Sequence, residues 1–270
     1  MAVSAKVTDR ISTQLKKYNS ILAQAQKKDI NEADTSAIIR DMLCDVLGYD
    51  RVTDVTAEKA IKGAKADLAV VVDGTIRFLI EAKAIGVSLK DKHERQIIDY
   101  AANQGTDWVL LTNGINWRLY KVLFGQPVGE NLLCEMDVLN SPPRSSKLAE
   151  MIDCFGNLSR EYFSKDTMDT YFEHKRLTSR FAVAAVMLTE PILNQVRLEL
   201  RRMSPGLRVD VEDLEALVAS EVIKRELIDS DEGKAAQILV KRLQKNYAKE
   251  RKETEEKTAD PPVTLGPAKT

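Results

Sequence analysis

The chain has 270 residues, of which 44% are hydrophobic and 30% are charged, and its formal net charge is −1. This length allows one sizeable core and a smaller second unit, and the composition is typical of a globular, helix-rich protein. No apolar stretch approaches the roughly 18 residues of a membrane span and the first residues lack the apolar segment of a signal peptide, so we expect a cytoplasmic protein with no membrane partner.

Cysteine spacing and charge balance bear on two further classes. Cys44, Cys134 and Cys154 show no C-x-x-C spacing, so we expect reduced thiols and no zinc site. The balanced charge argues against a nucleic-acid partner, because DNA affinity depends largely on cationic contacts with phosphate. A local basic rim is an alternative, although each residue taken alone fits a solvated surface better. Its candidates are Lys59, Lys62, Lys65, Lys90, Lys92 and Arg95.

The first part of the chain alternates helical and strand patterns. Residues 4–28 are amphipathic, and Asn31 begins a second helix whose apolar positions continue to Leu47, before the C-cap residue Gly48. A further helix is predicted from Ser88 to about residue 104. Turns are predicted at Asp73-Gly74 and Asn113-Gly114. The predicted strands are 51–58, 67–72, 76–83, 108–112, 116–122 and 132–136.

This order predicts an α/β (α+β) fold with a mixed central sheet flanked by helices. We divide the chain into an N-terminal helix (1–30), an α/β core (31–140), a helical region (147–252) and a disordered tail (253–270), with the Pro- and Ser-rich residues between core and helical region as the boundary. The helices expected in the helical region are 147–163, 167–203 with a break before Pro191, 210–229 and 232–252.

Two carboxylates and a lysine stand where two of these strands end. Asp67 opens the run to Val72, and Glu81 and Lys83 close the next run. Such a cluster is costly in a half-buried sheet unless a cation is expected there, and oxygen ligands of this kind suit Mg²⁺. The alternative for Glu81 and Lys83 alone is a surface ion pair. Their place at the end of an apolar strand, one hairpin after Asp67, favours a phosphodiesterase site.

Strand register provides a check on this site. With a plain two-residue turn at Asp73-Gly74, Asp67 would face Ile80, and Asp67 and Glu81 would point to opposite faces of the sheet. They share a face only if the turn has three residues or a bulge intervenes. We therefore predict one of these two features between Val72 and Ile76.

Two helices carry further candidate residues. Glu32 lies in the first turn of its helix, where the helix dipole alone favours an acid, or it is an outer carboxylate that binds metal through water. Gln96 and Tyr100 share a helix face and either pack on the sheet or place Gln96 near metal or substrate. His93 is a weak candidate for a general base. Trp117 and Tyr120 are expected to lie in the core.

Together these residues resemble the PD-(D/E)xK nuclease superfamily, and most of all the N-terminal nuclease domain of type I restriction enzyme R subunits and its stand-alone relatives. The resemblance covers residues 28–125. Its phrases are Asn31-Glu32-Ala33-Asp34-Thr35, Leu47-Gly48-Tyr49-Asp50, Ala66-Asp67, Glu81-Ala82-Lys83, Gln96-Ile-Ile-Asp-Tyr100, and Leu110-Leu-Thr-Asn-Gly114 with Trp117-Arg-Leu-Tyr120. Ala66 stands where the name-giving proline would be, and the helical region beyond residue 145 matches no known pattern.

The resemblance implies a restriction-endonuclease-like core and a Mg²⁺-dependent endonuclease, with Mn²⁺ as a substitute metal. Asp67, Glu81 and the Ala82 carbonyl would bind the metal, with Glu32 as an outer acid through water. Lys83 would be catalytic, and Glu32 and Gln96 would complete the catalytic set. Cleavage in such enzymes leaves 5′-phosphate and 3′-hydroxyl ends.

Three functional hypotheses follow. The first is a stand-alone DNA endonuclease of a defence or mobile-element system, with DNA as partner and a homodimer for double-strand cutting. The second is a nuclease-fold module that binds DNA or protein without cutting. The third is a subunit that acts only beside a motor or specificity protein, because the chain has no GxxxxGK[ST] motif for ATP-driven translocation. The first is favoured over the second by the intact set of Glu32, Asp67, Glu81, Lys83 and Gln96.

Overall fold

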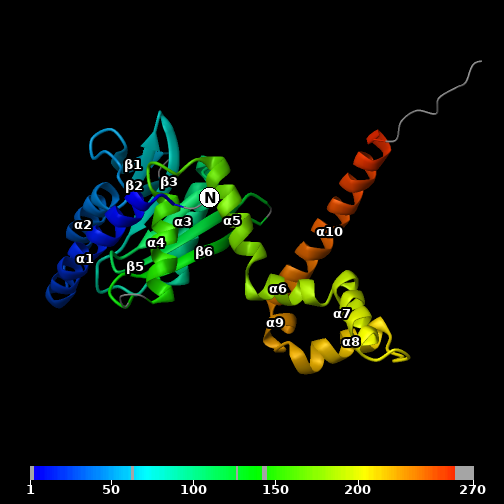
Figure 1. The fold of residues 1–270 in the computed structure, drawn as a ribbon. Helices are drawn as coiled ribbons and strands as arrows, with labels where there is room; N and C mark the ends of the chain where they lie inside the picture. The colour runs from blue at the N-terminus through cyan, green and yellow to red at the C-terminus, as the bar shows by residue number, and fades with distance from the viewer. Residues whose placement is uncertain (1–2, 62–63, 126, 142–144, 259–270) are drawn as a thin grey trace, which may run out of the picture. The chain divides into compact units, whose positions relative to one another are not determined.

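The computed structural model of the protein describes residues 3–61, 64–125, 127–141 and 145–258 (Figure 1). The chain divides into two compact units, Met1–His174 and Lys175–Thr270. The first contains a six-stranded mixed sheet with helices, and the second is helical, which confirms the predicted fold class. None of the helices in the described ranges combines the length and apolarity that a membrane crossing needs.

The sheet follows the sequence in its strand order, β1-β2-β3-β4-β5-β6. Neighbouring strands are antiparallel except β3 and β4, which run parallel and are joined through helix α3 (Asp91–Gln104). A parallel pair requires such a crossover, because a tight turn can join only antiparallel strands. The strands are β1 (Val55–Ile61), β2 (Ala64–Val72), β3 (Thr75–Ala82), β4 (Trp108–Thr112), β5 (Asn116–Leu123) and β6 (Gly129–Asp137).

Two predicted elements begin later than the sequence indicates. The strand expected from residue 51 starts at Val55, because the Asp50 carboxylate accepts hydrogen bonds from the backbone N–H groups of Val52 and Thr53 and closes a turn there. Helix α3 starts at Asp91 rather than after Ser88.

A β-bulge lies in the β2–β3 hairpin, as the site requires. The turn at Asp73-Gly74 has two residues, because Val72 pairs with Thr75 and Val71 with Ile76. Val70 then pairs with Phe78, so Arg77 is the extra residue. The bulge therefore lies just beyond the predicted interval, and the three-residue turn does not form. Continuing the shifted register from Leu68 and Ile80 sets Asp67 opposite Glu81.

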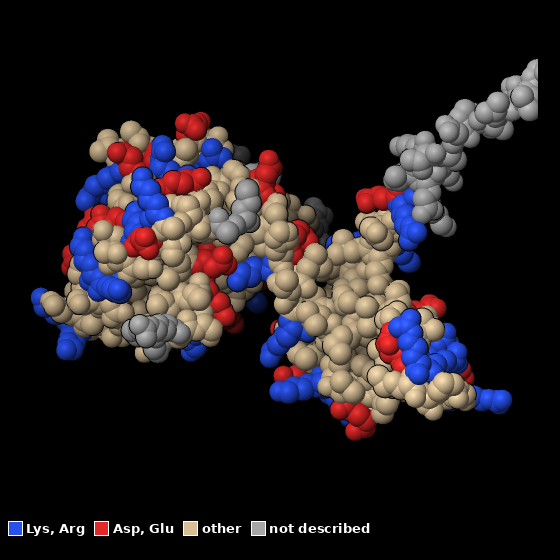
Figure 2. Space-filling view, viewed as in Figure 1, with Lys and Arg blue, Asp and Glu red and all other residues tan. Residues whose placement is uncertain are grey.

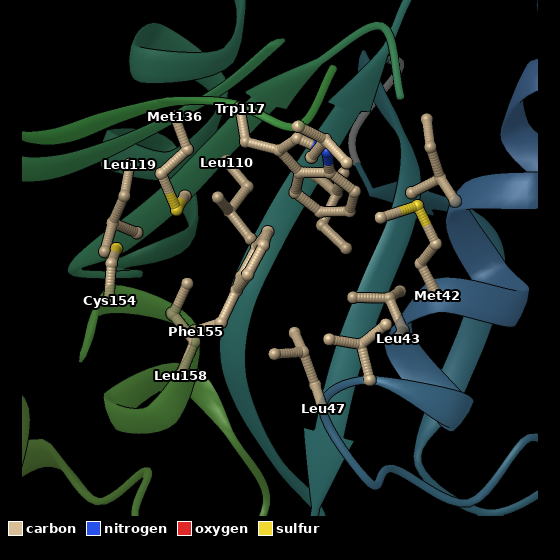
Figure 3. Packing of buried hydrophobic residues seen from close by; sticks show 14 of the residues in the cluster. Met42, Leu43, Leu47, Leu110, Trp117, Leu119, Met136, Cys154, Phe155 and Leu158 are labelled. Carbon is tan, nitrogen blue, oxygen red and sulfur yellow. The ribbon is translucent and has the colours of Figure 1, made fainter. Parts of the chain in front are cut away.

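Each face of the sheet has its own apolar core. Helices α1 (Ala5–Lys28), α2 (Glu32–Asp45) and α4 (Ser146–Leu158) pack with one face, where Figure 3 shows Met42, Leu43 and Leu47 opposite Trp117 and Phe155. Helix α3 packs on the other face. Alternation along β3 sends Ile80 to the first face and Leu79 to the second, so Glu81 points to the α3 side.

Helix α4 belongs to the first unit, which therefore extends past the boundary predicted at 141–146. Phe155 is 1% exposed and contacts Trp117 edge-on at 5.5 Å between ring centroids. A disulfide joins Cys134 of β6 to Cys154 of α4, so the expectation of reduced thiols holds only for Cys44. Helix α5 (Lys165–Leu177) contributes Met168 and Phe172 to the same core.

The second unit consists of short helices and one long one. The helix predicted over 167–203 is broken at Ser179 as well as before Pro191, because the Ser179 hydroxyl caps a new helix by accepting the N–H of Ala182. The last helix continues through residue 258, six residues into the predicted disordered tail, and 259–270 lie outside the described residues. The helices are α6 (Arg180–Met187), α7 (Glu190–Met203), α8 (Val211–Leu217) with a π-helical turn (Val218–Val222), α9 (Glu226–Asp229) and α10 (Asp231–Thr258).

Because α4 completes the first core, Phe155→Ala should lower the free energy of unfolding of that unit by about 3–5 kcal/mol. Both tryptophans, Trp108 and Trp117, lie in the first unit, so urea unfolding followed by tryptophan fluorescence reports on it alone. Phe124→Ala, at a side chain 54% exposed, is the matched control and should change stability by no more than about 0.5 kcal/mol. Equal effects of both variants would show that α4 is not part of this core.

Candidate active site

A buried ion pair lies at the end of β3. The Lys83 Nζ atom is 2.7 Å from Oε1 of Glu81 and donates a hydrogen bond to it. Glu81 is 2% exposed, and the side chain of Lys83 is 14% exposed. Strand β3 ends at Ala82, one residue before the predicted end, and Lys83 follows it directly, so its side chain lies on the same side as that of Glu81, two residues earlier.

Asp67 faces this pair from the neighbouring strand. Its Oδ2 atom accepts a hydrogen bond of 2.8 Å from the backbone N–H of Ala82, which holds the carboxylate beside the end of β3. Its charge acts on both Glu81 and Lys83. The bulge at Arg77 therefore achieves what the sequence argument required, since Asp67 and Glu81 meet on one face.

Glu32 approaches from helix α2. It is the first residue of that helix, which the side chain of Asn31 caps by accepting the N–H of Asp34 at 2.9 Å. Its Oε2 atom lies 3.8 Å from Nζ of Lys83, while its side chain is 53% exposed. Glu32 thus has both properties considered for it: a helix N-terminal position that favours an acid, and a place at the edge of the cluster.

The cluster shifts the pKa of its members in a way that reveals crowded negative charge. Burial raises the pKa of Glu81, and the charges of Asp67 and Glu32 raise it further, against the opposing effect of Lys83. Burial alone would lower the pKa of Lys83, but its hydrogen bond to Glu81 and the three surrounding carboxylates outweigh burial and raise it. Lys83 is therefore an ammonium ion, and one lysine does not fully compensate three acids.

Several residues not identified from the sequence hold the segment after β3 in place. The Lys83 backbone N–H donates to the carbonyl of Thr112 at 2.8 Å, and the Ile85 N–H donates to the Thr35 hydroxyl of α2 at 3.1 Å. The Asn113 side chain donates to the carbonyl of Val87 at 2.9 Å. Asn113 and Thr35 lie within the sequence segments that resemble the nuclease family. Only the three-dimensional arrangement shows that they hold the segment after β3, which begins with Lys83.

Gln96, the remaining predicted site residue, is on α3 but is not in contact with the acids. Its side chain is exposed and makes no hydrogen bond within the described part of the chain. Tyr100, one turn later, is buried on the sheet as one of the two alternatives expected. His93 instead caps the start of α3, where its Nδ1 atom accepts a hydrogen bond from the backbone N–H of Lys90 at 3.3 Å. A role for Gln96 toward substrate stays a prediction.

The other predictions near the site have mixed outcomes. Trp117 and Tyr120 are 1% and 2% exposed, which confirms that they are core residues. Lys90, Lys92 and Arg95 lie exposed at α3, whereas the side chains of Lys59, Lys62 and Lys65 are outside the described residues. Charged side chains of both signs intermix on the face of the first unit visible in Figure 2.

The donor set fits a hard divalent cation with an incomplete protein shell. Within the described ranges no three His, Cys, Asp or Glu side chains are arranged to hold a metal ion by themselves. Mg²⁺ is commonly bound by one or two carboxylates, with water and substrate phosphate supplying the rest, and Asp67 and Glu81 provide this number. Burial raises the pKa of Glu81, and the charges of Asp67 and Glu32 raise it further, so a cation beside these acids would favour their ionised forms.

The Glu81–Lys83 pair makes a stability prediction for the metal-free protein. Lys83→Ala should lower the free energy of unfolding by about 3–5 kcal/mol, because it leaves a buried carboxylate without its cation. The double variant Lys83→Ala/Glu81→Gln removes the uncompensated charge and should be more stable than Lys83→Ala alone. Urea unfolding in EDTA, followed by tryptophan fluorescence, measures both. A double variant no more stable than the single one would contradict a buried ionic pair.

Comparison with known proteins places this site in a family context. The family model described as "Type I restriction enzyme R protein N terminus (HSDR_N)" matches residues 39–131. No curated protein and no solved structure was found to match the chain. The matched segment includes the strands that bear the buried ion pair and the helix that bears Gln96, but not Glu32. Residues 39–131, with Asp67, Glu81 and Lys83, are thus related to the N terminus of type I restriction enzyme R proteins.

Proposed function

We propose that this protein is a metal-dependent deoxyribonuclease that hydrolyses DNA phosphodiester bonds. The observation that carries the proposal is the buried Lys83–Glu81 pair beside Asp67, in the segment related to restriction enzyme R proteins. A purely structural ion pair would not need a second carboxylate aligned by a bulge. Buried, pKa-shifted groups gathered at one point are a recurring property of catalytic sites.

In this proposal the carboxylates of the site bind the metal ion. Asp67 and Glu81 would hold Mg²⁺, or Mn²⁺ in its place, with the Ala82 carbonyl as a further ligand and Glu32 acting through water. When bound, the metal supplies Lewis-acid polarisation of the scissile phosphate and makes water more acidic. Asp67 is already oriented for this by the Ala82 N–H.

Lys83 supplies fixed positive charge at the reaction centre. Its ammonium group is held by Glu81 and backed by the Thr112 carbonyl through its own backbone N–H, so it is placed before substrate arrives. Charge placed in advance stabilises the additional negative charge that develops on the phosphate during hydrolysis. Gln96, exposed on α3, would contact substrate phosphate.

A restriction, defence or mobile-element role is the context in which this activity fits best. The related family is defined by subunits of a larger enzyme, and this chain contains no nucleotide-binding GxxxxGK[ST] motif. Translocation, if it accompanies cutting, would be supplied in trans by a motor or specificity subunit.

A partner-dependent or non-cleaving subunit is the second candidate function. Exposed apolar side chains in the second unit favour it, since groups of them mark interaction surfaces more often than they occur on isolated monomers. Val183, Val186 and Met187 of α6 and Ile192 and Val196 of α7 are all exposed. The buried apolar cluster between α6 and α10 is small by comparison and consists of Ala185, Ala236 and Val240.

Cleavage is the direct test. Wild-type protein incubated with Mg²⁺ or Mn²⁺ should nick or linearise supercoiled plasmid, or degrade single-stranded DNA, and EDTA should stop the reaction. Lys83→Ala and Asp67→Ala should each lower the rate by at least about 100-fold, as removal of one preorganised transition-state contact does elsewhere. Gel electrophoresis of time courses measures the rate.

Lys16→Ala, at an exposed position on α1, is the matched control and should cut like the wild type. Activity that survives in both Lys83→Ala and Asp67→Ala would point to a contaminating nuclease. A folded wild type with no activity under any of these conditions would favour the second candidate, and the same assay with a partner protein would then decide between dependence and loss of cutting.

Metal binding has a separate signature. Mg²⁺ that binds only the folded state should stabilise the protein by about 2.7 kcal/mol at a concentration of 100 times its Kd. Glu81→Gln should abolish this increment, measured as the difference in urea unfolding with and without Mg²⁺. Glu135→Gln, which removes an exposed acid paired with Arg118, should retain it. An increment of equal size in both variants would place the metal elsewhere.

A further inference from the structure

A cleft of about 530 Å³ extends from the acid cluster along helix α2. Glu32 and Asp67 line its acidic end, and Ser36, Arg40 and Arg51 line the remainder. Glu32, Ser36 and Arg40 follow one another at intervals of four residues on α2, so they occupy one face of the helix. The cleft therefore joins the proposed metal site to a region of opposite charge.

Arg40 differs from the other arginine of the cleft in its surroundings. Arg51 is paired with Asp41, with 2.7 Å between Nη1 of the arginine and Oδ1 of the aspartate, and its side chain is 60% exposed. Arg40 is half-buried, and its Nε atom is buried without a hydrogen-bond partner. Within the described residues Arg40 makes no ion pair or hydrogen bond, and the hydroxyl of Ser36 makes no hydrogen bond either.

The Nε atoms of Arg77 and Arg197 are also buried without a partner, but neither of those residues lines this cleft. A buried polar atom left without a partner costs about 1–3 kcal/mol, and a guanidinium ion presents five N–H donors in a planar fork. The acids at the other end of the cleft do not neutralise it, even though Glu32 is on the same helix. An anionic group entering the cleft would supply the missing partner.

The geometry of α2 limits where that anion lies. Glu32 and Arg40 are eight residues apart, which corresponds to about 12 Å along a helix axis. Side chains on a helix lean toward its N-terminus, so the Arg40 side chain extends back toward Ser36 and the acidic end. The anion would thus be held near the reaction centre but not in it.

We propose that Arg40, assisted by the Ser36 hydroxyl, binds a phosphate that neighbours the scissile phosphate on the same DNA strand. The inference rests on the proposed nuclease function and adds to it a substrate-binding subsite. The guanidinium fork matches two phosphate oxygens, and a strand lying in the cleft would place one phosphate at the acids with metal and the next at Arg40. The cleft then requires at least two consecutive phosphates for full affinity.

The test measures binding apart from cleavage. The full chain binds a fluorescein-labelled oligonucleotide whose linkages are phosphorothioates, which keep their charge and resist hydrolysis, in Mg²⁺ at several salt concentrations. Arg40→Gln should weaken binding about tenfold, the equivalent of one hydrogen bond to a charged group. The slope of log K against log salt should become shallower by about 0.7 on a single strand or 0.9 on a duplex.

Arg51→Gln is the matched control, because it removes the same charge from the same cleft at an arginine that already has a partner; it should change affinity and slope less. Arg40→Lys provides a second variant that keeps the charge, and it should retain the slope while binding more weakly than wild type. Equal effects of Arg40→Gln and Arg51→Gln, or an Arg40→Lys that binds as wild type, would overturn the inference.

The outcome also separates this inference from the nuclease proposal. If wild type cuts plasmid but Arg40→Gln binds as wild type does, the subsite is rejected and the nuclease stands. If wild type neither binds the oligonucleotide nor cuts plasmid, both are rejected.

Discussion

The pairing register between β2 and β3 is the constraint on which the candidate site depends. Side chains alternate along a strand, so a shift of one residue moves a side chain to the other face of the sheet. The extra residue Arg77 supplies that shift, and only beyond it do Asp67 and Glu81 stand opposite each other. A bulge leaves one residue outside the hydrogen-bonded ladder, and here the disruption is far from the strand ends where the chemistry would take place.

The electrostatics of the site follow from this alignment. Glu81 is almost fully buried, and the carboxylates of Asp67 and Glu32 repel its negative charge. Without a nearby cation, a buried charge of this kind would be unfavourable. Lys83 offsets part of this cost through a short hydrogen bond. The remaining excess of negative charge suits the divalent cation proposed for this site, while Arg40 contributes a positive group to the adjoining cleft.

Much of the first unit could be predicted from local patterns. The alternation in β2 and β3, the apolar run of β4 and the helix cap at Asn31 are set by neighbouring residues. The requirement that two acids share a face also predicted either a three-residue turn or a bulge between Val72 and Ile76. The bulge instead lies just beyond this interval, at Arg77, where the register shifts between Val70 and Val71.

Other features depend on contacts between distant segments. Nothing near Arg40 in the sequence marks it, because its significance comes from a cleft formed with β1 and β2. The sequence placed helix α4 at the start of a separate helical region, because amphipathicity does not specify which surface a helix packs on. The contact of its Phe155 with Trp117 shows that it packs on the sheet of the first unit. The exposure of Gln96 likewise follows from how α3 is rotated on the sheet, which residue spacing constrains only to within a face.

The single parallel pair has a consequence for when activity can arise. Lys83 is anchored through its backbone to Thr112, a residue that joins the sheet only after the α3 crossover has been made. Contacts between residues so distant in sequence form late, because the closure entropy of the intervening loop must first be overcome. A nascent or truncated chain that ends before β4 contains both acids and the lysine, yet lacks the strand that positions them. Under the proposed function, such a fragment would lack the geometry that cleavage requires.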